Sequence, residues 1–148
     1  TTPDIQDIYV GDNDVTEIIR GELITSLVSK VAAIPAVRAL LVARQQEIVS
    51  NAAQGIVVEG RDIGTVVLPD AHLKLYITAD PSVRASRRAA QVEGDVEATQ
   101  ESLLARDHAD STRQVSPLEL ADDAILLDTT HMDLPEVIEH VLALVAER

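Results

Sequence analysis

The chain has 148 residues, of which 46% are hydrophobic and 25% charged, enough for one domain. Twelve basic against 25 acidic residues give a formal net charge of −13, which argues against a nucleic-acid backbone or an anionic membrane as a main partner. There is no cysteine, and the four histidines lack paired ligand spacing, so we expect neither disulfides nor a structural metal. No apolar run approaches the length of a membrane span and no signal segment opens the chain, so we expect a cytoplasmic location.

The first third of the chain predicts a hairpin followed by two helices. A Gly-Asp-Asn turn at 11–13 joins two short strands, at 9–10 and 14–15. Apolar residues at three- and four-residue steps predict a helix over about 16–34, which a proline interrupts. That proline stands near the first turn of a second predicted helix, over 35–50, whose apolar stripe is Val37, Leu40, Leu41 and Ile48.

The remainder alternates strands with helices. Core strands are predicted at 56–59, 73–78 and 124–128. Asp80 and Pro81 have the residue types of an N-cap and a first helical position, for a helix that ends near residue 92. Further helices are predicted over 97–107 and 134–147, separated by a polar loop and then a strand, and the last helix directs inward Val137, Ile138, Val141, Leu142 and Val145. This order predicts the α/β class, with a parallel sheet and helices on both faces.

The stretch 56–67 combines an apolar strand with a Gly60-Arg61-Asp62 turn, which puts a guanidinium and a carboxylate at the edge of a sheet. In α/β proteins that edge is where ligands bind. Ten of the twelve basic residues are arginine, whose fixed fork of donors suits phosphate and carboxylate groups. The turn is therefore the first candidate for a polar site.

Four segments resemble the bacterial cytidylate kinase family, in chain order and over most of the sequence. They are Ser29-Lys30-Val31-Ala32-Ala33-Ile34-Pro35-Ala36-Val37-Arg38, Gly60-Arg61-Asp62-Ile63-Gly64-Thr65-Val66-Val67, Pro69-Asp70-Ala71 and Arg106-Asp107-His108-Ala109-Asp110-Ser111-Thr112-Arg113. The resemblance implies phosphoryl transfer from ATP to CMP or dCMP, in pyrimidine nucleotide metabolism. It also implies a three-layer P-loop nucleoside monophosphate kinase fold, with a CMP-binding helical insert at 1–50 and part of the kinase core at 51–148, including a lid at about 81–113.

One feature of that family does not occur in these residues. Its phosphate-binding loop has the form G-x-x-x-x-G-K-[ST] and holds the ATP phosphates with backbone N–H groups and a lysine. The two lysines here, Lys30 and Lys74, follow Ser29 and Leu73, so neither belongs to such a loop. We therefore expect that the first strands and the phosphate loop are missing, and that ATP and Mg²⁺ are held mainly by that absent segment.

The resemblance also implies roles around the acceptor nucleotide. Arg61 would hold the phosphate of CMP, and Asp62 would accept a hydrogen bond from the amine of cytosine, with Ser29 and Arg38 also binding the base. The residues alone leave other interpretations open. Arg61 could be a surface arginine paired with Asp62, and Asp62 a turn former bonded to its own backbone. Ser29 could be a helical hydroxyl with no binding role, and Arg38 an exposed helical charge.

The remaining candidate residues belong to the lid. Arg84 and Arg88 are four residues apart on a predicted helix and so point the same way. By resemblance they are the catalytic arginines that close over the ATP phosphates, although a solvated helix face is the alternative. On the return of the lid, Arg106 and Asp110 would bind the ribose of CMP and Arg113 its phosphate. No metal ligand is expected among these residues.

Three hypotheses about function remain open. The chain is a cytidylate kinase without its N-terminal part, a catalytically inactive CMP-binding module, or a structural or interaction segment whose arginines no longer have a binding role. We expect nucleotides as its partners, namely CMP or dCMP and ATP, with no nucleic acid and no membrane. The complete protein is expected to be a monomer.

Overall fold

The computed structural model describes residues 7–92 and 94–148, without the side chains of Glu22, Ser26, Ser29 and Val92. The chain begins its described part with an antiparallel hairpin of β1 (Tyr9–Val10) and β2 (Asn13–Asp14). Gly11 turns the chain at φ 59°, a value that glycine adopts without strain. The hairpin prediction is confirmed, with the second strand starting one residue earlier than expected.

The helix predicted over 16–34 is interrupted before its middle. A 3-10 turn, η1 (Ile18–Arg20), precedes α1 (Glu22–Ala32), because Gly21 takes an extended conformation with ψ 157° between them. Helix α2 (Pro35–Ser50) has the predicted bounds. The predicted apolar stripe of α2 is largely exposed, with Leu40 at 71%. The residue that α2 buries is Arg38.

The strand predicted at 56–59 does not form. Strands need backbone partners, and the two sheets of the described residues, β1–β2 and β3–β4, do not include this segment. Val57 is accordingly 98% exposed. After the Gly-Arg-Asp turn the chain forms a single π turn, η2 (Ile63–Val67), in which the N–H of Val67 bonds the carbonyl of Asp62 at 3.2 Å.

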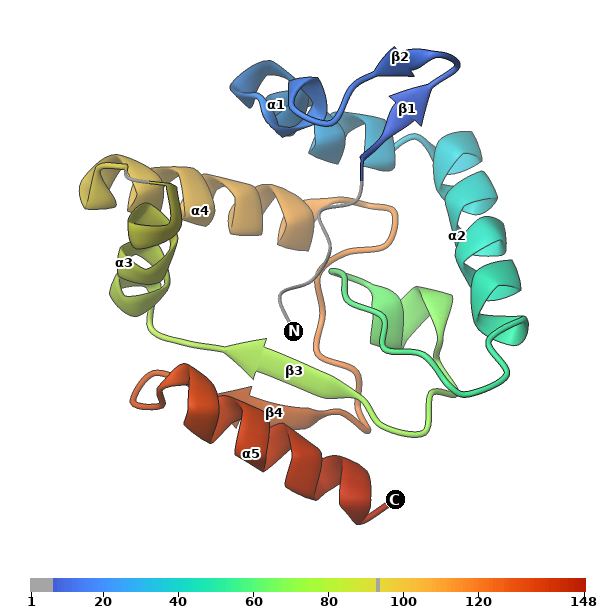
Figure 1. Cartoon of the computed structure of the whole chain (residues 1–148), viewed down its shortest axis with the longest axis vertical. Coiled ribbons are helices and arrows are strands. Elements are labelled where there is room, and N and C mark those ends of the chain that lie inside the picture. Colours follow the sequence, from blue (N-terminus) through green and yellow to red (C-terminus); the bar gives the residue numbers. More distant parts are fainter. Residues whose placement is uncertain (1–6, 93) are drawn as a thin grey trace.

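A parallel sheet confirms the predicted α/β class. Strands β3 (Leu75–Thr78) and β4 (Ile125–Asp128) lie within the predicted strand segments and pair in parallel. The α3–α4 hairpin extends from the end of β3 (Figure 1). Helix α3 (Pro81–Val92) starts at the predicted cap, because Asp80 accepts a hydrogen bond from the N–H of Ser82 at 3.0 Å. Helix α4 (Val96–Thr112) continues past the predicted end at residue 107.

The last helix, α5 (Leu134–Ala146), begins with a capping box between Asp133 and Glu136. Its bounds agree with the prediction, but three of the five side chains predicted to point inward are exposed, namely Ile138, Leu142 and Val145. Within the described residues no single helix is long and apolar enough to span a membrane. One pair of helices, Leu23–Ala32 and Pro35–Ser50, together has the length and composition of a span, but the pair is bent by 91°. The buried apolar residues of the described part are Val67, Ala79, Ala85, Ala89 and Leu127.

A carboxylate lies at the carboxyl end of each parallel strand. Asp80 comes after β3, and the hydrogen bonds from Ser82 lower its pKa below the usual 3.8. Asp128 ends β4, and hydrogen bonds from Thr130 lower its pKa in the same direction. Thr130 also accepts a hydrogen bond from the N–H of Asp80 at 2.8 Å, so the ends of the two strands are fastened to each other.

Candidate active site

A buried ion pair joins α2 to the Gly-Arg-Asp turn. Arg38 donates from Nη2 to Oδ2 of Asp62, and its Nε donates to Oγ of Ser116 at 3.3 Å. The side chains of Arg38 and Asp62 are 11% and 5% exposed. Burying charges this deeply is costly unless they are paired, and the contact with Asp62 supplies that pairing for the arginine that α2 directs inward. The alternative that Arg38 is an exposed helical charge is wrong.

Arg61, from the same turn, lies between two carboxylates of α4. Its Nη1 is 3.2 Å from Oδ1 of Asp107, and its Nε is 3.2 Å from Oδ2 of Asp110. Asp110 is almost fully buried, and Arg106 also approaches it, at 3.9 Å. Because α4 continues to Thr112, the residues at 106, 107 and 110 lie within little more than one helical turn. The alternative that Arg61 pairs with Asp62 on the surface is not what the structure contains.

Asp107 connects this turn to α3. Its Oδ2 accepts a hydrogen bond from Nη1 of Arg84 at 2.5 Å, while Oδ1 is buried near Arg61 without a well-directed hydrogen bond. Arg87, the next arginine of α3, donates to the carbonyls of Thr129 and Met132, which fastens α3 to the end of β4. The α3 arginines 84 and 87 are thus already engaged by the protein.

Arg88 is different from its neighbours on α3. It is exposed, and within the described residues its guanidinium group donates to Oε1 of Gln91, on the same helix, at 3.3 Å. It does not join the carboxylates of α4 in the ion pairs of the described residues. The predicted common orientation of Arg84 and Arg88 is therefore realised only in part, since Arg84 alone reaches Asp107.

In the segment after α4, Ser116 accepts hydrogen bonds from two arginines of the site, Arg38 and Arg113. Arg113 donates from Nε to the carbonyl of Ser116, and lies 3.8 Å from Asp110 and 4.0 Å from Asp62. Ser116 is buried and has φ 52°, in the left-handed region that L-residues rarely adopt. A non-glycine residue there costs about 1–3 kcal/mol and is found where the surroundings demand it. Here the demand is the pair of contacts to Arg38 and Arg113.

Together these side chains form one arginine–carboxylate cluster. Its members are Arg38, Arg61, Arg84, Arg106, Arg113, Asp62, Asp107 and Asp110. Five guanidinium groups face three carboxylates, so the cluster has an excess of two positive charges in a chain whose net charge is −13. A phosphate monoester carries about −1.5 to −2 charges at neutral pH, which matches that excess.

A cavity opens among these charges. It measures about 160 Å³ and is lined by Val28, Ala32, Arg38, Gln45, Gly60, Arg61, Asp62, Ile63, Arg106, Asp110 and Arg113. Small-molecule sites usually measure about 300–1,000 Å³. The cavity is therefore smaller than the usual small-molecule site, and arginine–carboxylate ion pairs lie around it.

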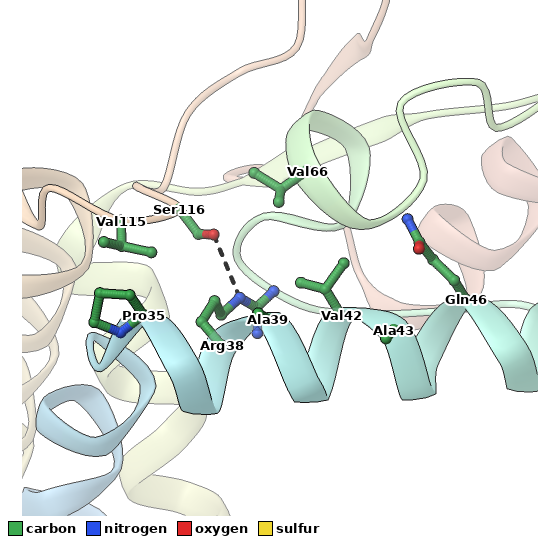
Figure 2. A pocket seen from close by; sticks show the side chains of 9 residues that line it. All are labelled: Pro35, Arg38, Ala39, Val42, Ala43, Gln46, Val66, Val115 and Ser116. Atoms are coloured by element: carbon green, nitrogen blue, oxygen red, sulfur yellow. Dashed lines mark hydrogen bonds between the residues drawn. The ribbon is translucent and has the colours of Figure 1, made fainter.

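A larger cavity of about 430 Å³ follows another face of α2 (Figure 2). Its walls are mainly apolar, and Gln46 stands at one end, where its Nε2 donates to the carbonyl of Val67 at 2.9 Å. Arg38 and Ser116 stand at the other end, joined by the hydrogen bond drawn in Figure 2. Its polar side chains, Arg38, Gln46 and Ser116, are already hydrogen-bonded within the protein, so the charged cavity is the better candidate for a nucleotide.

Most predicted site residues come together in the cluster. Six of the seven predicted substrate-binding residues are members, and the side chain of the seventh, Ser29, lies outside the described residues. Of the two predicted catalytic arginines, Arg84 is a member and Arg88 is not. The sequence interpretation gave no role to Asp107, Ser116 or Gln45. Continuing the α4 prediction past Asp107 would have revealed that this carboxylate lies beside Asp110.

The described residues do not by themselves form a Mg²⁺ site. No group of three or more histidine or carboxylate side chains within them is arranged to hold a metal ion. The three carboxylates of the cluster are each engaged with arginine instead. What the arrangement can do is bind an anion and the polar edge of an attached ring.

Comparison with known proteins identifies the family. A family model described as cytidylate kinase matches residues 2–147. The chain belongs to the cytidylate kinase family. It is 52% identical over 146 residues to a cytidylate kinase of Streptomyces griseus, covering 98% of this chain and 63% of that protein. A cytidylate kinase of Streptomyces avermitilis is 50% identical over 149 residues, which is 100% of this chain and 64% of the relative.

A more distant cytidylate kinase, from Streptococcus pneumoniae, is 48% identical over 141 residues, which is 92% of this chain and 62% of that protein. The chain thus spans a little under two thirds of the length of these relatives. Membership in the cytidylate kinase family supports the P-loop nucleoside monophosphate kinase fold, with which the parallel β3–β4 sheet and its helices agree.

Proposed function

We propose that this chain forms the acceptor side of a cytidylate kinase, which binds CMP or dCMP for phosphoryl transfer from ATP. The observation that carries the proposal is the excess of two positive charges in the arginine–carboxylate cluster, at a partly buried site of an otherwise acidic chain. The names of the relatives supply the nucleotide class. We infer that the product is CDP or dCDP.

Binding begins with an exchange of partners at the phosphate. Arg61 lies 3.2 Å from both Asp107 and Asp110, so these two carboxylates fix the orientation of its guanidinium group. Guanidinium groups bind phosphate with two parallel hydrogen bonds. A phosphate of CMP would take over donors of Arg61 and Arg113, while the carboxylates keep the guanidinium groups oriented.

The base would be recognised beside the buried ion pair. Asp62 is 4% exposed and is held by Arg38, with Arg113 at 4.0 Å. Its carboxylate is an acceptor only, which suits the amine of cytosine and disfavours the carbonyl oxygen of uracil. A site built to accept from an amine rejects a base that lacks one, because a buried acceptor is left unpaired. Ser29 and Arg38 are proposed to complete this recognition.

Transfer requires groups that the described residues do not supply. The 148 residues contain no G-x-x-x-x-G-K-[ST] loop, and the positions of ATP and Mg²⁺ are therefore proposed to depend on another segment. Arg84 and Arg88 are proposed to stabilise the charge that develops on the transferring group. Arg106 and Asp110 are proposed to bind the ribose, and 1–50 and 81–113 to act as the insert and the lid.

An assay of the purified 148-residue chain tests the proposal in two parts. We expect CMP to bind in calorimetry, and no CMP-dependent formation of ADP in a coupled assay. Formation of ADP above background would show that the chain needs no phosphate loop.

A second candidate is a CMP-binding module without transfer activity, since the proposed acceptor-side residues form a cluster of their own within the described residues. Joining the chain to a cytidylate kinase segment that supplies the loop separates the two. A kinase gains CMP-dependent ADP formation from this fusion, whereas a binding module retains CMP binding and gains none.

A further inference from the structure

The charged cavity contains one polar group that the proposed site does not explain. Gln45 lines this cavity with Arg38 and Asp62. Its Oε1 is buried and has no hydrogen-bond partner in the part of the chain that the structure describes. Buried polar atoms are almost always paired, so such an atom calls for an explanation.

The position of Gln45 on α2 connects it to base recognition. Gln45 follows Arg38 by seven residues, which is about two turns of an α-helix, so both side chains project from the same face of α2. That face borders the Gly-Arg-Asp turn, where Arg38 pairs with Asp62. A ring bound at Asp62 would therefore lie near the amide of Gln45.

An amine in a closed site has two hydrogens that need acceptors. Asp62 can accept one of them, but its Oδ2 is already engaged by Arg38. The second hydrogen needs a further acceptor, which the hydroxyl of Ser29, proposed above to bind the base, or a group that lines the cavity can supply. Of the described side-chain atoms, the buried Oε1 of Gln45 is the acceptor that lacks a donor in this cavity.

We propose that Gln45 is a further specificity-determining residue, whose amide oxygen accepts the second hydrogen of the 4-amino group of cytosine. This inference rests on the proposed function, because it requires that a cytosine nucleotide occupies the charged cavity. Binding would supply the missing donor for Gln45 and a further acceptor for the amine at the same time. Uracil has a carbonyl oxygen at that position and so cannot donate to Gln45.

The neighbouring residue provides a matched control. Gln46 has the same side chain on the same helix, but it lines the larger cavity and its amide donates to the carbonyl of Val67 at 2.9 Å. Replacing Gln46 by methionine removes its hydrogen bond to Val67, which lies outside the charged cavity. Replacing Gln45 by methionine removes an unpaired oxygen inside it.

The experiment titrates CMP and UMP into the full chain and its variants by calorimetry, and records each melting temperature. We expect Gln45→Met to weaken CMP binding by about fivefold to tenfold, the effect of losing one hydrogen bond, with UMP binding changed less and the melting temperature not lowered. Gln46→Met should lower the melting temperature and keep the ratio of CMP to UMP affinity. Gln45→Glu, which keeps acceptor oxygens and cannot donate, should preserve the preference for CMP.

Two results would overturn the inference. If the unmodified chain prefers CMP and Gln45→Met preserves the ratio of CMP to UMP affinity, Gln45 does not determine specificity, while the proposed function stands. If the unmodified chain has no preference for CMP, the proposed function fails, and this inference fails with it.

Discussion

Removing the carboxylate of Asp62 should destabilise the chain strongly, because it leaves a buried guanidinium without its counter-charge. The side chain of Arg38 is 11% exposed, and that of Arg113, 4.0 Å from Asp62, is 10% exposed. Breaking a buried ion pair by removing one partner costs about 3–5 kcal/mol. The free energy of unfolding of native domains is about 5–15 kcal/mol, so the Asp62→Ala variant should lose a large share of it.

Urea denaturation followed by circular dichroism measures this loss, and a double variant isolates its cause. Arg38→Met together with Asp62→Ala removes both charges of the pair. We expect the double variant to recover most of the loss, because no unpaired charge of that pair remains buried. If Asp62→Ala costs less than about 1 kcal/mol, or if the two changes destabilise additively, the pair is solvated and our reasoning about its burial is wrong.

Three further predictions concern Arg61, the lid arginines and the first turn of α3. Arg61→Lys keeps the charge but cannot reach two carboxylates and a phosphate with one ammonium group, so calorimetry should find CMP binding weakened by about tenfold; unchanged binding would contradict the bidentate role. In a form of the protein that carries the phosphate loop, Arg84→Ala and Arg88→Ala should lower turnover by about 10- to 100-fold and CMP affinity much less; steady-state kinetics equal to the unmodified enzyme for both would remove the lid assignment. Hydrogen bonds from Ser82 lower the pKa of Asp80 in the folded chain below 3.8, so the stabilisation is complete above that pH and is lost as the pH falls through the folded pKa. Asp80→Asn, which keeps a capping oxygen, should therefore flatten the acid-side decline of unfolding free energy below about pH 4; an unchanged decline would show that Asp80 contributes nothing to it.

Local sequence signals predicted the elements whose determinants are local. Pro35 fixed the start of α2, and Asp80 with its following proline fixed the start of α3. The strand predicted at 56–59 does not form, because its determinants are not local. Its residues have the composition of a buried strand, but whether they form one depends on a neighbouring strand that is not in the described sheets. The end of α4 was also missed, because a polar helix that runs into a site resembles a loop in sequence.

The candidate site was predictable where a motif carried it. The Gly60-Arg61-Asp62 turn and the Arg106 to Arg113 spacing pointed to residues that do come together. Ser116 could not be found in this way, because its left-handed φ of 52° follows from the tertiary contacts of its carbonyl and hydroxyl and not from its residue type. Gln45 likewise is one of two adjacent glutamines, and only the structure separates the unpaired one from the bonded one.

Calorimetric titration of the unmodified chain with CMP, cytidine, UMP and AMP tests the central claim most directly. An arginine–carboxylate cluster with an excess of two positive charges should bind the phosphate, and the buried Asp62 should select the base. We predict that CMP binds more tightly than cytidine, UMP and AMP. Equal affinity for CMP and UMP, or for CMP and cytidine, would contradict the assignment of this cluster as a cytidine monophosphate site.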